Sequence, residues 1–79
     1  MEVSKSWLKD KLKVGFSGDG TGFRLIKDGY VVWNDSNKSY TKNELVDKIY
    51  SIQQSYDFDE IVLHGGDVKR IDLNEEDNN

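Results

Sequence analysis

Residues 23–34 read FRLIKDGYVVWN, and this stretch decides the fold of the chain. The pair Asp28–Gly29 separates two apolar runs, and Asp-Gly in that position is the strongest short-range signal for a β-hairpin with a two-residue turn. Because such a turn fixes the register, the sequence predicts that Lys27 pairs with Tyr30 and that pairing continues one residue at a time. The further expected pairs are Ile26 with Val31, Leu25 with Val32, Arg24 with Trp33, and Phe23 with Asn34.

Two segments that precede the hairpin have periodicities of their own. Apolar residues recur at helical spacing near the N-terminus, and Ser4 can cap a short helix over residues 4–12. Leu12, Val14 and Phe16 alternate with polar or small residues, which predicts a strand over residues 13–18.

A second helix and two more strands follow the hairpin. Thr41 and Glu44 match a capping box, in which each side chain satisfies a backbone N–H at the helix start. The helix predicted over residues 42–56 has one apolar stripe, made of Leu45, Ile49, Ile52 and Tyr56. Residues 60–64 and 67–73 are predicted strands, and Gly65–Gly66 is a second two-residue turn signal.

The expected fold is therefore a two-layer α+β domain. It consists of a short N-terminal helix, a three-stranded antiparallel meander, one amphipathic helix that covers the meander, and a C-terminal β-hairpin. The sequence leaves open whether that hairpin extends the meander or lies apart. Residues 1–73 are expected to form this single domain, and residues 74–79, NEEDNN, a disordered acidic tail.

Composition narrows the class of protein. The chain has 79 residues, no Cys and a net charge of −4, so a small core must be stable without disulfides. We find no signal peptide and no run long enough to span a membrane, which favours a cytoplasmic protein without a membrane partner. Lys, Asn, Asp and Ile are frequent while Ala and Pro are missing. This bias is typical of AT-rich bacterial or phage genes, and suggests a small accessory protein.

A glycine-rich stretch, GFSGDGTGF at residues 15–23, raises the question of a phosphate-binding loop. Such a loop needs a strand before it and a helix N-terminus after it, because the helix supplies N–H groups to the anion. Here a strand follows the glycines, so we interpret the stretch as a loop that joins two strands. A calcium loop is excluded because Asp19 lacks the alternating acids that such loops carry.

No catalytic constellation is present in the sequence. His64 is the only histidine, and neither a nucleophile nor further metal ligands cluster with it by spacing. Asp57, Asp59 and Glu60 follow a helix and precede a strand, which is typical of solvated loop acids. We therefore expect no enzyme activity, no metal and no cofactor.

The hairpin offers a candidate partner-binding surface. The register places Arg24, Ile26, Val31 and Trp33 on one face, and a single helix cannot cover both faces. We expect a cation–π pair of Arg24 with Trp33 there. A partly uncovered Trp beside an Arg is typical of interface hot spots. Alternatively, the N-terminal helix or the last two strands cover this face. The candidate residues are Trp33, Arg24, Ile26, Val31, Tyr30 and Lys27.

Two functions remain open at this stage. The preferred one is a small non-catalytic protein-binding module or inhibitor, which could associate with itself through the Trp33/Arg24 face. The alternative is a nucleic-acid-binding domain that uses the sheet aromatics and the lysines of the first helix. The net negative charge favours a protein partner over nucleic acid.

The expected α-β-β-β-α order resembles that of the double-stranded RNA-binding domain. That family carries a lysine-rich start to its last helix, whereas Thr41–Glu44 offers Lys42 beside an acid. Three strands followed by a helix are also similar to the small DNA-binding sheets of integrase arm domains. Both resemblances are of element order, so they imply the alternative function without assigning a family.

Overall fold

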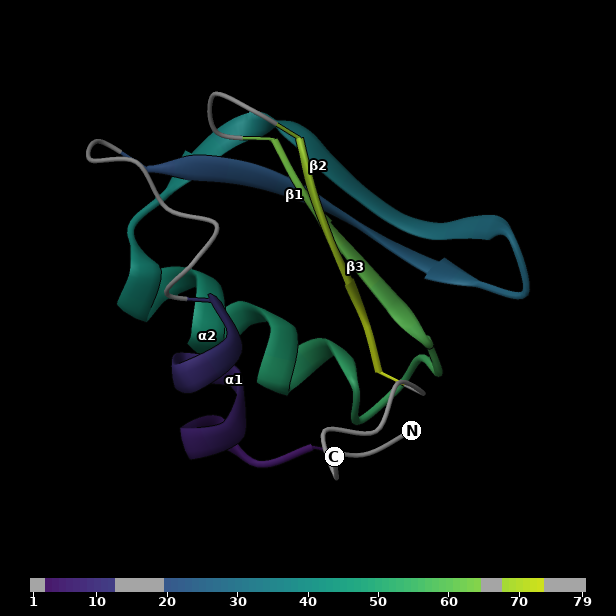
Figure 1. Cartoon of the computed structure of the whole chain (residues 1–79), viewed down its shortest axis with the longest axis horizontal. Coiled ribbons are helices and arrows are strands. Elements are labelled where there is room, and N and C mark those ends of the chain that lie inside the picture. The colour runs from purple at the N-terminus through teal and green to yellow at the C-terminus, as the bar shows by residue number, and fades with distance from the viewer. Residues whose placement is uncertain (1–2, 13–19, 65–67, 74–79) are drawn as a thin grey trace.

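The computed structural model describes residues 3–12, 20–64 and 68–73. In this part of the chain, two helices lie on one face of a four-stranded antiparallel sheet (Figure 1), which agrees with the expected α+β class. The sheet order is β2-β1-β3-β4. The elements are α1 (Lys5–Leu12), β1 (Thr21–Lys27), β2 (Tyr30–Tyr40), α2 (Lys42–Ile52), β3 (Glu60–Leu63) and β4 (Lys69–Asp72).

The arrangement of the strands differs in part from the expected meander followed by a hairpin. The strand expected over residues 13–18 and the tail expected at residues 74–79 lie outside the described residues. β3 pairs with β1 and β4 pairs with β3, both antiparallel. The last two strands therefore extend the sheet that the β1–β2 hairpin begins, and β1 becomes a central strand.

The turn of the hairpin is the one that the sequence predicts. Asp28 and Gly29 have φ values of 52° and 85°, so both central residues are left-handed, as a type I′ turn requires. Lys27 pairs with Tyr30 and Ile26 with Val31, which confirms the expected register next to the turn.

Beyond these two pairs the predicted register is wrong by one residue. Leu25 pairs with Trp33 and Arg24 with Asn34, because Val32 is an additional residue in β2 and creates a β-bulge. The expected pair of Arg24 with Trp33 is therefore not formed. A residue added to one strand exchanges the faces of the side chains that follow it.

A second irregularity in β2 wraps around Gly22. Phe23 pairs with Asp35 but Thr21 pairs with Tyr40, so residues 36–39 have no counterparts of their own in β1. A Cβ atom on Gly22 would lie 2.5–2.7 Å from the carbonyl oxygens of Asp35, Ser36 and Lys38. Only glycine allows β2 to curl this closely over β1.

The core lies between the helices and one face of the sheet. Phe23 and Leu25 of β1 contact a buried cluster that includes residues of both helices, of β3 and of the connection after α2. Its fully buried members include Leu8, Leu12, Leu45, Ile49, Phe58, Ile61 and Leu63. Thr41 and Glu44 form the expected capping box at the start of α2.

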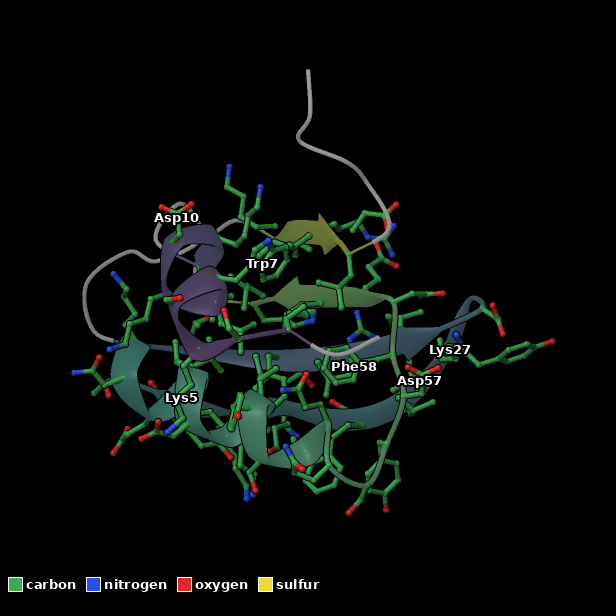
Figure 2. All side chains as sticks on the ribbon, turned by 90° about the horizontal axis from the view of Figure 1, so that it is seen from below. Lys5, Trp7, Asp10, Lys27, Asp57 and Phe58 are labelled. Carbon is green, nitrogen blue, oxygen red and sulfur yellow. The ribbon has the colours of Figure 1, made fainter. Side chains whose placement is uncertain are left out.

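Hydrogen bonds also attach the N-terminal segment to α2. The Gln53 side chain accepts a hydrogen bond from the Val3 N–H at 2.9 Å and donates one to the Val3 carbonyl at 2.8 Å. On the surface, Lys5 Nζ lies 3.2 Å from Asp47 Oδ1. These contacts hold α1 beside α2 on the same side of the sheet (Figure 2).

We predict that Gly22→Ala lowers the free energy of unfolding by about 2–3 kcal/mol, because backbone carbonyl groups cannot move away as a side chain can. Gly29→Asn is the matched control, since Asn tolerates a positive φ and no atom lies within 4 Å of a Cβ there. Urea denaturation of the two variants measures the difference. Equal losses in both variants would show that the approach over Gly22 can relax.

Candidate functional site

The side of the sheet that faces away from the helices is the candidate site. Phe23, Leu25, Ile61 and Leu63 point into the core, and side chains alternate along a strand, so their neighbours point to the opposite side. Figure 1 shows both helices on the core side of the sheet. We call the opposite side the open face, and define it by Arg24, Ile26, Val31, Asn34, Glu60, Val62, His64, Arg70 and Asp72.

The strand registers arrange most of these residues in two rows across all four strands. The arginine row carries two positive charges, and the acidic row beside it carries two negative charges. From β2 to β4, the arginine row is Asn34, Arg24, Val62 and Arg70, and the acidic row is Val31, Ile26, Glu60 and Asp72.

Each arginine of the open face has a polar partner on the same face. Arg24 Nε donates a hydrogen bond to His64 Nε2 at 3.0 Å. Arg70 Nε lies 3.2 Å from Glu60 Oε2, and the Glu60 side chain is only 23% exposed. These contacts fix the directions of both guanidinium groups over the sheet.

His64 is held in its neutral form by this arrangement. Burial lowers the pKa of His64, and the positive charge of Arg24 lowers it further. A neutral imidazole has one nitrogen that can accept a hydrogen bond, and Nε2 uses it for Arg24. His64 therefore acts in this structure as an acceptor that orients Arg24.

Two aliphatic residues lie at the centre of the open face. Ile26 is 7% exposed and Val62 is 1% exposed, although neither belongs to the core cluster. The cross-strand neighbours of Val62 are Arg24 and Arg70, whose hydrocarbon stems can cover apolar surface beside them. Both aliphatic side chains are thus already covered within the monomer.

The six residues that the sequence suggested for partner binding fall into two groups. Arg24, Ile26 and Val31 share the open face, and Val31 is 47% exposed. Trp33 lies on the helix side, where it packs against the core cluster. Tyr30 is 77% exposed next to the turn, and its cross-strand partner Lys27 forms an ion pair with Asp57 at 3.0 Å (Figure 2).

Trp33 is integrated into a polar and aromatic cluster under α2. Its Nε1 donates to Asp35 Oδ2 at 3.0 Å, and the Tyr40 hydroxyl donates to the same oxygen at 2.8 Å. The Tyr56 ring stands edge-on to Trp33 at 5.4 Å, and Lys48 Nζ lies 5.3 Å from the indole. The expected cation–π pair with Arg24 is thus replaced by one with Lys48, because the bulge turns Trp33 toward the helix.

Asp35 remains ionised within this cluster. Burial raises the pKa of Asp35, but the hydrogen bonds from Trp33 and Tyr40, together with the positive charges of Lys38 and Lys48, lower it overall. Burial, and then the hydrogen bond to Asp35, raise the pKa of Tyr40 to about 12. The cluster fastens the irregular part of β2 to the helix side and has a structural role.

The sequence reasoning missed six residues of the open face: Asn34, Glu60, Val62, His64, Arg70 and Asp72. The alternation of Glu60, Val62 and His64 was visible in the predicted strand. What the sequence lacked was the pairing of β3 with β1, which brings His64 to Arg24 although 40 positions separate them.

A shallow hollow of about 270 Å³ lies on the helix side of the molecule and is lined by Ser6, Lys9, Asp10 and Lys42. The adjacent N-terminus of α2 already has its own acceptors in Thr41 and Glu44, so it offers little to an added anion. Within the described ranges, no three potential metal ligands come together.

Among the residues that the structure describes, neither helix is long and apolar enough to cross a membrane. The sequence matches no family model, and the comparisons with curated proteins and with solved structures find no match either. The chemistry of the open face is therefore the basis on which we propose a function.

We predict that Arg24→Gln raises the pKa of His64 without restoring it to about 6.5, because burial persists after the charge is removed. NMR titration of the single imidazole measures this change. In the parent protein the folded state disfavours the imidazolium, so the free energy of unfolding falls as the pH falls from about 6.5 to the lowered pKa. An unchanged titration in Arg24→Gln would contradict the Arg24–His64 contact.

We also predict that Trp33→Ala lowers the free energy of unfolding by about 2–4 kcal/mol, because the indole packs against the core. Trp33→Phe keeps an aromatic ring but loses the N–H donor to Asp35, so its loss should be nearer to 1 kcal/mol. Urea denaturation compares the two variants. A loss below about 0.5 kcal/mol in Trp33→Ala would instead place the indole in solvent.

Proposed function

We propose that this chain is a small non-catalytic protein-binding module whose open face contacts its partner. The observation that carries the proposal is the pair of arginines, Arg24 and Arg70, each held by a polar partner on a face where Val31 is exposed. Arginine is enriched among the strongest contacts of protein–protein interfaces.

The edges of the sheet support binding through the face. β2 is an edge strand with two register shifts, and such irregularities prevent another strand from pairing along it. β4 is the other edge, and three of its four residues are charged, namely Lys69, Arg70 and Asp72. Short, charged edge strands oppose strand addition, so the face is the better docking surface.

The positions of the aromatic residues favour a protein partner over nucleic acid. A sheet that binds single-stranded nucleic acid stacks bases on aromatic side chains of its exposed face. Here Phe23, Trp33 and Tyr40 contact the core on the helix side. Glu60 and Asp72 on the open face would also repel a phosphate backbone.

The state of His64 supports binding over catalysis. A general base must keep a free acceptor nitrogen for the substrate proton, whereas His64 Nε2 already accepts the Arg24 N–H. The composition, rich in Lys, Asn, Asp and Ile, is compatible with an accessory protein of bacterial or phage type in the cytoplasm.

A random peptide display library panned on the immobilised protein tests the proposal. The selected peptides are titrated into isotopically labelled protein, and NMR shifts locate the binding surface. We expect the largest shifts on β1, β3 and β4 at open-face positions. The double substitution Arg24→Ala and Arg70→Ala should weaken binding at least about tenfold, in line with arginine hot spots.

The matched control removes two positive charges from the helix side, through Lys5→Ala and Lys9→Ala, and should leave the affinity unchanged. Shifts confined to α1 and α2 would overturn the proposal. Tight binding of a single-stranded oligonucleotide at moderate salt, lost in the arginine variant, would replace it with the nucleic-acid function.

A further inference from the structure

We infer that the partner of the open face is a second copy of this chain, so that the protein forms a two-fold symmetric dimer, sheet against sheet. This inference rests on the proposed function and names the partner that the open face takes.

The open face carries balanced charges. Arg24 and Arg70 are positive, Glu60 and Asp72 are negative, and His64 is held neutral. A partner of one charge sign would meet repulsion from half of these groups, and unpaired charges at an interface cost several kcal/mol. A second copy offers the same four charges and leaves no excess of either sign.

The order of the rows makes the face complementary to itself. The arginine row and the acidic row lie side by side and run across the same strands. A two-fold axis between the rows, parallel to the sheet and perpendicular to the strands, lays each row of one copy over the other row of its partner. Such self-complementarity is what an interface with two-fold symmetry requires.

In this arrangement the outer charges meet directly. Arg70 of one copy lies over Asp72 of the other, twice, because both residues are on β4. Arg24 lies over the partner's Ile26, which pairs with the partner's Glu60 on the next strand. The long side chain of Arg24 can reach that Glu60. Aligned sheets also cross at about 30°, which moves neighbouring strands toward one another at the interface.

The size of the face predicts a weak dimer. The four strands have seven, eleven, four and four residues, and at about 4.8 Å between strands and about 3.3 Å rise per residue they give a projected area of roughly 400 Å² for each copy. A stable interface usually buries about 800 Å² on each partner. We therefore expect association that depends on concentration, with monomers present at micromolar protein.

Sedimentation equilibrium of the full chain between about 10 μM and 1 mM is the first test, a range in which weak interfaces are populated. The expected average mass rises from 9.1 kDa toward twice that value. A charge-swap experiment then tests the face. Variant A carries Arg24→Glu and Arg70→Glu, and variant B carries Glu60→Arg and Asp72→Arg.

Variants A and B should each remain monomeric, because like charges then oppose one another, with dissociation constants raised at least about tenfold. Mixed in equal amounts, they should form a heterodimer, since acids of one then face arginines of the other. The variant with all four substitutions restores both rows in exchanged positions and should dimerise again. NMR spectra of each variant confirm that it is folded.

The remaining outcomes separate the two proposals. A mass of 9.1 kDa at all concentrations, with library peptides still bound to the open face, overturns the dimer and leaves the protein-binding function standing. A dimer that variants A and B do not weaken also overturns the inference, because its interface lies elsewhere. A monomer whose open face binds no peptide overturns both.

Discussion

One additional residue in β2 determines which side chains reach each face of the sheet. Next to the turn, β1 and β2 pair as an uninterrupted hairpin, and Val32 then inserts opposite β1. From that point the face of each β2 residue is exchanged. Trp33 therefore lies on the helix side, where it donates a hydrogen bond to Asp35 and contacts the ring of Tyr56. Asn34 becomes the cross-strand partner of Arg24. Because of the bulge, the Trp33 ring packs against the core, and the described β2 residues on the open face carry no aromatic ring.

The two sides of the sheet are built on the same strands but with different chemistry. On the helix side, large apolar residues fill the space between β1, β3 and the two helices. On the open face, one ion pair and one hydrogen bond orient the two arginine side chains beside Ile26 and Val62. Burial of apolar surface stabilises the domain from one side, so the other side can be arranged for recognition.

Local patterns in the sequence predicted local structure well. The Asp28–Gly29 turn, the capping box at Thr41 and Glu44, and the starts of both helices follow from interactions between residues close in the chain, whereas α2 ends at Ile52 and not at the expected residue 56. The bulge could not be predicted from the sequence, because nothing in YVVWN distinguishes an additional Val from a paired one. The pairing of β3 with β1 is a long-range choice that no local pattern encodes. The candidate site depended on both, so Trp33 was expected on the wrong side of the sheet, and the residues that β3 and β4 contribute were missed.

The central pairing of β1 with β3 determines at which step of folding the open face forms. Arg24 and His64 are 40 positions apart, and the hairpin and α2 lie between them. Hairpins and helices form from local contacts within about microseconds. Pairing with a strand far away in the chain is slower, because closing the long loop between them costs conformational entropy. The arginine row is thus assembled only when β3 and β4 have joined the sheet. A partner that recognises the arginine row binds only the complete native state. By mass action, such a partner raises the free energy of unfolding of the domain.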